Sequence, residues 1–233
     1  MKRKKNQGLE FFWGTVILLV FFALTLVGNP KGILEIQLNR LHQPIFDILF
    51  AALTQLGNGI IFLPIAIFFL FQKTSFSIFL GFCGLFNAIF VFVGKKLLFP
   101  GAPRPVEYLK GMEFYQVPGV DLHHWNSFPS GHTTTGFSLA FALAIIFSKY
   151  PKIQRLMLIL AIGIGLSRVY LMQHFFIDIW AGAALGLVAT LSAKEITLRY
   201  FSSKKFRKPL FRSKPSRFPT LRRRVILQQK LVG

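Results

Sequence analysis

The chain has 233 residues, of which 53% are hydrophobic and only 15% are charged, a balance that excludes an ordinary soluble globular protein with a charged surface. The formal net charge of +20 would suit a nucleic-acid-binding protein, but the basic residues gather at the two ends, in residues 2–5 and after residue 198, rather than on a folded soluble face. No nucleic-acid partner is therefore expected.

Six apolar segments come close to the length of about 20 residues that crosses a bilayer. The first follows a basic leader, as in a signal peptide, but no A-x-A-like site ends it at Gly28, so it is predicted to remain as a span. The single cysteine, Cys83, lies in the third segment, facing lipid or the core, and predicts no internal disulfide. The predicted fold is all-α, a six-span transmembrane helical bundle with spans near 9–28, 56–72, 76–98, 130–147, 153–171 and 176–198.

The segments between and beyond the spans have their own patterns. Residues 30–54 interleave apolar and charged positions, which predicts a helix lying in the membrane interface. Residues 99–128 form a polar loop. The expected organisation is a basic N-terminus at 1–8, a six-span domain at 9–198 and a basic tail at 199–233, disordered or membrane-associated. The tail has twelve Lys or Arg and no acid, which suits anionic lipids or a solvated segment that only enforces topology.

Positive charge predicts the orientation of the bundle. Lys and Arg occur in residues 2–5, in the turn with Lys73, in the turn between spans four and five and in the tail. With six spans these segments share one side, which must be the cytoplasm. We therefore expect a multi-pass plasma (inner) membrane protein with both termini cytoplasmic. The interfacial helix, the 99–128 loop and the turn near His174 then face the exterior or periplasm.

One cluster of polar residues flanks the turn between spans five and six: Ser167, Arg168, His174 and Asp178. His174 and Asp178 are four residues apart and share a helix face. The carboxylate can fix the imidazole tautomer and leave the other nitrogen free to attack. Ionisable groups in spans are costly and indicate function. A structural salt bridge between Arg168 and Asp178 that holds two helices together is the competing explanation.

A second cluster, Pro129, Ser130, Gly131 and His132, opens span four. Ser130 can cap the helix, and Gly131 permits close approach of a ligand to the backbone. Free N–H groups and the helix dipole favour an anion there. His132 is placed to deliver a proton. The alternative is a capped helix with an incidental histidine.

The third cluster supplies fixed positive charge at the outer end of span three, from Lys95, Lys96 and Arg104. A guanidinium grips phosphate oxygens with two hydrogen bonds, and a lysine acts as a point charge. At least one of the two lysines is expected to be only an interfacial residue that reaches lipid headgroups. Together the three clusters match phosphoryl transfer, which depends on positioning and charge stabilisation. No metal-ligand spacing occurs, so neither a metal nor another cofactor is expected.

With these motifs the sequence resembles the type 2 phosphatidic acid phosphatase superfamily of membrane lipid phosphatases, which includes the vanadium haloperoxidases. The matching parts are Lys96 to Arg104-Pro105, the run Pro129 to His132, and Ser167-Arg168 with His174 and Asp178. The family's first motif has six residues between Lys and Arg, whereas Lys96 and Arg104 have seven between them, so Lys95 is a second candidate.

The resemblance implies a phosphohistidine mechanism at the outer membrane face. His174 would attack phosphorus, Asp178 would orient it, and His132 would protonate the leaving oxygen. The phosphoryl oxygens would be held by Lys96, Arg104, Ser130, Gly131 and Arg168. The expected function is an integral membrane phosphatase acting on a lipid phosphate or diphosphate, with a membrane lipid as substrate partner.

Two other functions are considered, a haloperoxidase-like oxidation and a catalytically inactive scaffold or transporter that retains the anion site. Six spans without a large soluble shell argue against the first, and the intact His132, His174 and Asp178 argue against the second. Phosphatidic acid, phosphatidylglycerol phosphate, undecaprenyl diphosphate and lipid A phosphates all remain open as substrates. The sequence gives no indication of the oligomeric state.

Overall fold

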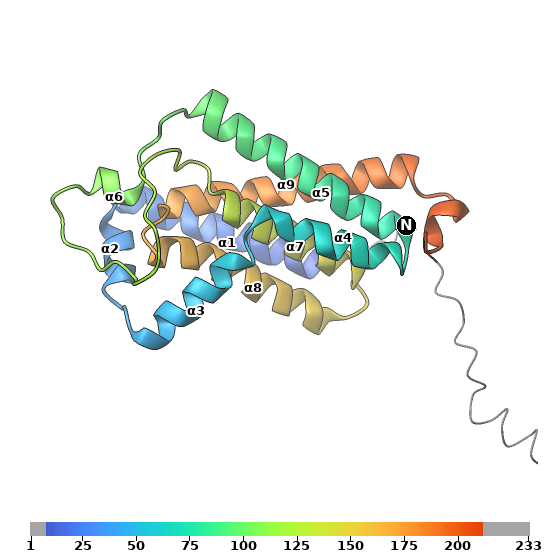
Figure 1. The fold of residues 1–233 in the computed structure, drawn as a ribbon, viewed down its shortest axis with the longest axis horizontal. Helices are drawn as coiled ribbons and strands as arrows, with labels where there is room; N and C mark the ends of the chain where they lie inside the picture. Colours follow the sequence, from blue (N-terminus) through green and yellow to red (C-terminus); the bar gives the residue numbers. More distant parts are fainter. Residues whose placement is uncertain (1–7, 212–233) are drawn as a thin grey trace, which may run out of the picture.

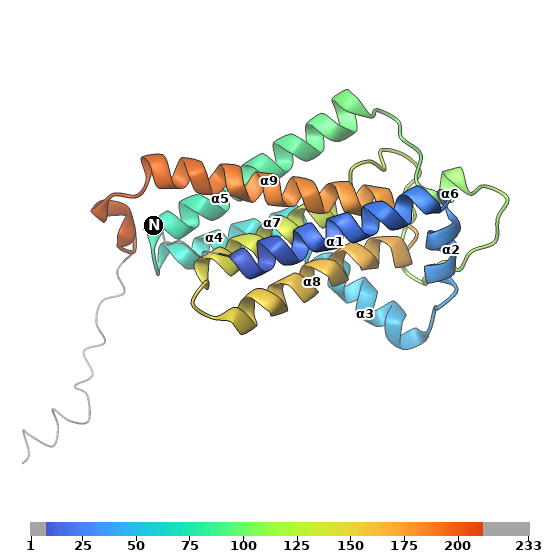
Figure 2. The same cartoon turned by 180° about the vertical axis from the view of Figure 1, so that it is seen from behind.

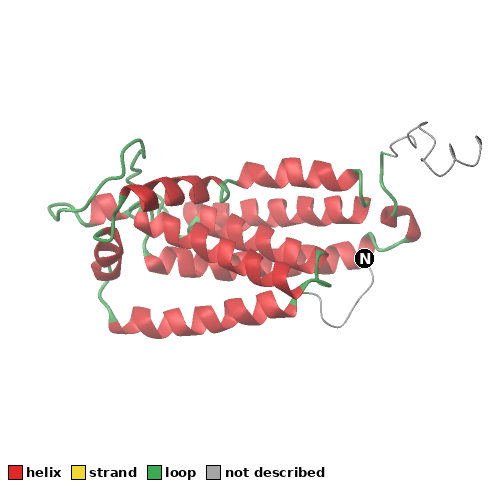
Figure 3. Cartoon of the chain, turned by 90° about the horizontal axis from the view of Figure 1, so that it is seen from below, coloured by secondary structure: helices red, strands yellow, loops and turns green. Residues whose placement is uncertain are grey.

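A computed structural model of the chain describes residues 8–211, and this part is built from helices and loops (Figures 1 and 3). The N-terminal residues 1–7 and the tail after residue 211 lie outside the described residues. The helices are α1 (Leu9–Gly28), α2 (Ile33–Asn39), α3 (Pro44–Gln55), α4 (Phe62–Leu70), α5 (Thr74–Phe92), α6 (Pro105–Tyr108), α7 (Gly131–Ile146), α8 (Pro151–Tyr170) and α9 (Phe176–Tyr200). Short 3₁₀ turns, η1 (Gly59–Ile61) and η3 (Lys204–Arg207), and a π-helical continuation of α5, η2 (Val93–Leu98), complete the set.

The described part is an all-α membrane bundle with four to five candidate spans. Four helical segments are long and apolar enough to cross a membrane, namely α1, α5 together with η2, α8 and α9. A fifth span arises if α3 and the η1–α4 segment, which are bent by 57° at their junction, count as one broken span. The remaining apolar helix, α7, has 16 residues and is shorter than the length that crosses a bilayer. The prediction of six full-length spans is thus met only in part.

The predicted single interfacial helix at residues 30–54 is wrong in its boundaries. The chain breaks there into α2 and α3, because Gln43 is extended and Pro44 starts a new helix at its first position. The helix α3 then leads through Gly57 and Asn58 into η1 and α4. At Gly57 a Cβ atom would lie 2.9 Å from the backbone oxygen of His132, so glycine lets this bend pack directly against the first turn of α7.

The centre of the bundle is α7, whose side chains are almost all buried, and which packs against α5, α8 and α9 (Figure 2). Two glycines one turn apart, Gly182 and Gly186, allow α9 to approach α7 closely. A Cβ atom at Gly182 would lie 2.8 Å from the Ser130 carbonyl oxygen, and one at Gly186 would lie 2.9 Å from the Thr134 carbonyl oxygen. Because the first of these contacts is at the start of α7, the packing of α9 sets the position of that helix end.

The loops gather at the two ends of the bundle. The short helices α2 and α6 and the long loop around them lie at one end, and the described chain begins and finishes at the other (Figure 1). The start of the basic tail is docked on the turn between α4 and α5: Thr74 donates from its amide and its hydroxyl to the Lys208 carbonyl, at 3.2 and 2.8 Å, and Leu210 donates to the Leu70 carbonyl at 2.9 Å. Cys83 is a free thiol buried in the core of the bundle.

Candidate active site

His174 and Asp178 form a buried pair at the start of α9. The Nδ1 atom of His174 lies 3.2 Å from Oδ2 of Asp178, and each residue is 1% exposed. The same carboxylate oxygen accepts the Phe175 amide at 3.0 Å and the Ser127 hydroxyl at 2.5 Å. A carboxylate that accepts the Nδ1–H leaves the lone pair on Nε2, the nitrogen with which an imidazole can act as a nucleophile.

The charge state of His174 follows from its surroundings. Burial lowers the pKa of the imidazole well below its usual value of 6.5, and the positive charges of Arg104 and Arg168 lower the pKa further. His174 is therefore neutral near pH 7, the form in which an imidazole acts as a nucleophile.

The two arginines that the sequence indicated converge beside this histidine. Arg104 donates from Nε to the Trp125 carbonyl at 3.0 Å and from Nη1 to the carbonyl and the side-chain oxygen of Gln173, at 3.0 and 3.1 Å. Arg168 donates from Nη1 to the Thr54 hydroxyl at 2.6 Å and from Nη2 to the same Gln173 oxygen at 3.4 Å. The hydrogen bonds of Arg168 thus go to Thr54 and Gln173, and the ion pairs of residues 8–211 do not include the Arg168–Asp178 bridge considered as an alternative.

Lys95, rather than Lys96, lies on the side of the site. Its Nζ donates to the Asn126 carbonyl at 2.7 Å, in the loop that also carries Ser127, whereas the Lys96 side chain is exposed. The π-helical turn η2 explains the difference, because its hydrogen bond from Phe99 N to Gly94 O spans five residues and shifts the facing of the side chains within it. The expected role of Lys96 in phosphate binding therefore passes, as a proposal, to Lys95.

The start of α7 brings the remaining predicted residues to the same place. Ser130 caps the helix by accepting the Thr133 amide at 3.4 Å, and its own amide donates to the Asp178 carbonyl at 3.1 Å. Gly131 and His132 form the first turn and are partly exposed. This backbone hydrogen bond joins the start of α7 to the start of α9. It therefore fixes the N-terminus of α7, with His132, relative to the His174–Asp178 pair.

Four buried residues that contact this group were not identified from the sequence as site residues: Thr54, Ser127, Gln173 and Glu35. Glu35, on α2, is 3% exposed and accepts the Phe176 amide at 2.8 Å, at the first residue of α9. Its other oxygen accepts the Gly32 amide at 2.9 Å. The predicted interfacial segment thus anchors the turn that carries His174.

The histidines outside the motifs lie in or against the loop at residues 99–128. His124 pairs with Glu107, Nδ1 to Oε2 at 3.0 Å, and His42 stacks on Tyr115 with ring centroids 4.0 Å apart. Partial burial, and then the charges of Arg104 and Arg168, lower the pKa of His123.

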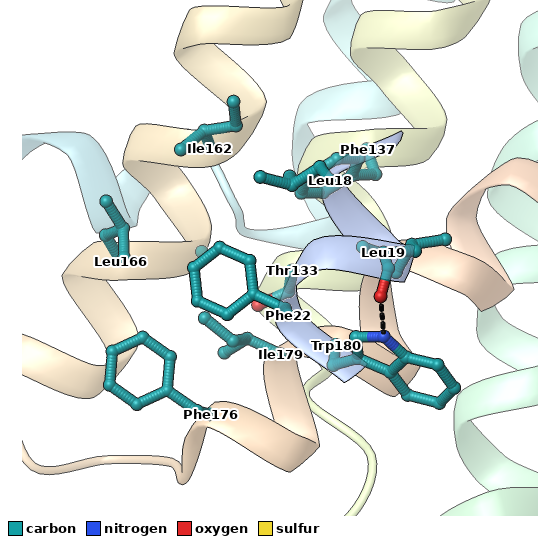
Figure 4. Close-up of a pocket in the computed structure, with 12 residues that line it drawn as sticks. Leu18, Leu19, Phe22, Thr133, Phe137, Ile162, Leu166, Phe176, Ile179 and Trp180 are labelled. Carbon is teal, nitrogen blue, oxygen red and sulfur yellow. Dashed lines mark hydrogen bonds between the residues drawn. The ribbon is translucent and has the colours of Figure 1, made fainter. Parts of the chain in front are cut away.

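An apolar pocket lies on one flank of the bundle (Figure 4). It lies between α1, α8 and α9, with Phe22, Leu166 and Phe176 among its walls, and Thr133 on α7 reaches it from behind. The Trp180 indole crosses from α9 to donate to the Leu19 carbonyl at 2.8 Å and holds α1 against the bundle. The lining of the pocket includes Thr133, the residue after His132, and Phe176, two residues after His174, so the pocket lies near the starts of α7 and α9 that carry the polar group.

Two curated relatives match parts of the chain. Bacitracin transport permease protein BcrC of Bacillus licheniformis is 42% identical over 66 residues, which are 28% of this chain and 31% of that protein. The putative undecaprenyl-diphosphatase YbjG of Escherichia coli K12 is 40% identical over 77 residues, 32% of this chain and 38% of that protein. Each match spans about a third of the relative's length.

Two crystal structures share the fold. LpxE of Aquifex aeolicus superposes with a TM-score of 0.60 at 25% identity, over 72% of this chain and 93% of that one. A PAP2-type phosphatidylglycerolphosphate phosphatase from Bacillus subtilis superposes with a TM-score of 0.57 at 23% identity, over 86% and 99%. The PAP2 superfamily profile matches residues 73–202, more than half of the chain, which include the Arg104, Ser130–His132, Arg168 and His174–Asp178 motifs. The resemblance predicted from those motifs is confirmed: the chain is a multi-pass membrane protein that belongs to the PAP2 superfamily.

Proposed function

We propose that the protein hydrolyses a lipid phosphate or lipid diphosphate at the outer face of the membrane through a phosphohistidine intermediate. The observation that carries this proposal is the buried His174–Asp178 pair, 3.2 Å apart, lying beside two converging guanidinium groups and a helix N-terminus. Such a group supplies a neutral nucleophile and fixed positive charge for the oxygens of a phosphoryl group. The apolar pocket on the membrane flank supports a lipid rather than a soluble substrate.

The proposed reaction has two steps. In the first, Nε2 of His174 bonds to phosphorus while the bond from phosphorus to the lipid oxygen breaks and His132 gives that oxygen a proton. In the second, water attacks the phosphohistidine, gives a proton to His132 and releases phosphate. Asp178 keeps His174 oriented throughout, and Lys95, Arg104 and Arg168, with the Ser130–Gly131 segment at the start of α7, hold the phosphoryl oxygens.

Among lipid substrates, a diphosphate of the undecaprenyl class is the first candidate, because the matched Escherichia coli relative is named a putative undecaprenyl-diphosphatase. Phosphatidylglycerol phosphate is the second, because the Bacillus subtilis neighbour is a phosphatase for that lipid. Detergent-purified protein assayed for phosphate release against both lipids, phosphatidic acid and a lipid A phosphate ranks them. Phosphate release from none of the four would favour the alternative, an inactive scaffold or transporter that retains the anion site.

The proposed topology counts the bent α3–α4 pair and α7 as spans, which gives six. Both termini then face the cytoplasm of a plasma (inner) membrane, the site faces outward, and the basic tail contacts anionic lipids. Cysteines placed at Glu113 and Ser203, in a Cys83→Ala background, test this with an impermeant thiol reagent on intact cells. Labelling of position 113 alone is expected, and labelling of position 203 alone would invert the topology.

The leaving group separates the two histidines. His174→Ala should abolish turnover of every substrate, because the nucleophile is lost. His132→Ala should lose about 10²–10⁴-fold on an alkyl lipid phosphate, whose alkoxide needs the proton, and much less on nitrophenyl phosphate, whose phenolate leaves without one. Arg168→Ala should lower the turnover of both substrates by a similar factor, because both carry the phosphoryl group that Arg168 is proposed to bind. If His174→Ala retained activity while His132→Ala lost activity on both substrates, the roles assigned to the two histidines would be reversed.

The reaction is proposed to need no metal and to be inhibited by vanadate, which can adopt the five-coordinate shape of the phosphoryl transition state. Activity should persist in a chelator and fall on titration with vanadate. Loss of activity in the chelator with recovery on addition of one metal ion would contradict the proposed mechanism.

A further inference from the structure

Gln173 lies between the two arginines of the site. It is 2% exposed, and its side-chain oxygen accepts from Arg104 Nη1 at 3.1 Å and from Arg168 Nη2 at 3.4 Å. Its side-chain nitrogen donates to the Asp121 carbonyl at 2.8 Å, in the outer loop. One glutamine in the turn after α8 therefore links Arg168 to two points that lie 69 and 52 positions earlier in the chain, Arg104 and Asp121.

The contacts of Gln173 fix the direction of its amide. The guanidinium groups carry only donors, and the Asp121 carbonyl is only an acceptor. Rotation of the amide by 180° would place the NH₂ group against two guanidinium groups and the oxygen against a carbonyl. The oxygen therefore faces Arg104 and Arg168, where it holds two positive charges on one acceptor in a buried site.

Two like charges brought together in a low-dielectric site repel each other. A carboxylate at this position would cancel much of that repulsion, but it would also occupy the guanidinium donors that a phosphoryl group needs. The acceptor present is instead a neutral amide. Moreover, Arg168 Nε is buried without a hydrogen-bond partner among residues 8–211, so this guanidinium retains binding capacity that its protein contacts do not use.

We propose that Gln173 is a positioning residue that holds Arg104 and Arg168 converged as a preformed site for phosphoryl oxygens while leaving their positive charge uncancelled. This rests on the proposed function, since it assigns those arginines to the phosphoryl group. The side-chain oxygen of Gln173 accepts from both guanidinium groups, and the hydrogen bond to the Asp121 carbonyl fixes its position. The neutrality of the glutamine is as necessary as its shape.

The test compares three replacements at this position, measured by vanadate binding to detergent-purified full-length protein as well as by turnover. Gln173→Glu keeps the shape and adds a charge; it should weaken vanadate binding by about 100-fold, because the carboxylate must be displaced from both guanidinium groups. Gln173→Leu removes the acceptor and should weaken binding by about 10-fold. Gln173→Asn draws the oxygen back by one methylene, so its vanadate affinity should lie between those of the wild type and Gln173→Leu.

A matched control is Gln116→Glu, which adds the same charge in the 99–128 loop, at an exposed side chain whose nitrogen donates to the Val120 carbonyl at 3.2 Å. It should bind vanadate like the wild type. Steady-state kinetics should show the Gln173 variants raising KM by the same factor on nitrophenyl phosphate and on the lipid substrate, because both share the phosphoryl group. A role in packing alone would instead lower the unfolding temperature without vanadate and leave vanadate affinity unchanged.

Equal losses in Gln173→Glu and Gln173→Leu would overturn the requirement for neutrality. Wild-type vanadate affinity in Gln173→Leu or Gln173→Asn would overturn the positioning role, and these two variants decide it even if Gln173→Glu does not accumulate. Stabilisation of the wild type but not of Gln173→Glu by vanadate, without turnover of any lipid in the panel, would support the inference while the proposed function fails.

Discussion

The close approach of α9 to α7 makes Gly182→Ala an informative perturbation. The added Cβ would lie 2.8 Å from the Ser130 carbonyl oxygen and 3.0 Å from the Thr133 Cβ. Carbon atoms prefer non-bonded separations of about 3.5 Å or more, so the two helices must part by about 0.5 Å at the start of α7. Overpacking of this kind costs about 1–3 kcal/mol of stability. Since a misplacement of about 1 Å can cost about 10²-fold in rate, kcat should fall roughly tenfold.

Two controls accompany this variant, each assayed by unfolding temperature in detergent and by phosphate release. Gly186→Ala creates a similar clash one turn deeper, 2.9 Å from the Thr134 carbonyl oxygen, and should lose stability with a smaller loss of kcat. Gly81→Ala meets nothing within 4 Å and should behave like the wild type. If Gly182→Ala keeps wild-type kcat, or if Gly186→Ala loses as much, the packing at Gly182 does not set the position of Ser130 and His132.

Three further outcomes are expected. Lys95→Met should lower kcat/KM by about 10–100-fold, the value of a charge-assisted hydrogen bond, and Lys96→Met should not; the reverse result would restore the lysine expected from the sequence. Glu35→Ala should lower the unfolding temperature and reduce kcat more than it changes KM, because the turn with His174 loses its anchor at the Phe176 amide. Glu113→Ala, at an exposed side chain, is the control and should behave like the wild type. The free energy of unfolding should fall below pH 6.5 by up to about 1.4 kcal/mol per pH unit, because burial lowers the pKa of His174 and only the unfolded chain then binds a proton at this imidazole. Unfolding temperatures of the wild type and of His174→Asn across pH 5–7 check this. Identical pH dependence in the two proteins would contradict it.

Sequence spacing predicts the contacts of those residues whose partners lie within about one helical turn along the chain. The four-residue spacing of His174 and Asp178 predicts a shared helix face, and the structure places them 3.2 Å apart. Ser130 before an apolar helix predicts a cap, and its side chain accepts the Thr133 amide. In both cases helix geometry alone determines the contact.

Other features depend on partners that sequence spacing does not reveal. Glu35 and Phe176 are 141 positions apart, and Thr54 and Arg168 are 114 apart. The pattern of residues 30–54 likewise indicated one interfacial helix, because amphipathic periodicity does not report where a chain turns between helices that both meet lipid. The choice between Lys95 and Lys96 depends on one π-helical hydrogen bond, for which the sequence carries no signal.

The contacts of Thr54 and Glu35 have a consequence for biogenesis. The first third of the chain supplies the partner of Arg168 and the anchor of the His174 turn, while His174 itself lies just before α9, the last long helix of the described bundle. During synthesis, Thr54 can therefore meet Arg168 once α8 has been made, whereas Glu35 must wait until the ribosome has released the start of α9. A nascent or truncated chain that ends after α8 lacks both His174 and the acceptor of the Ser127 hydroxyl, so the proposed site can form only when the start of α9 is in place.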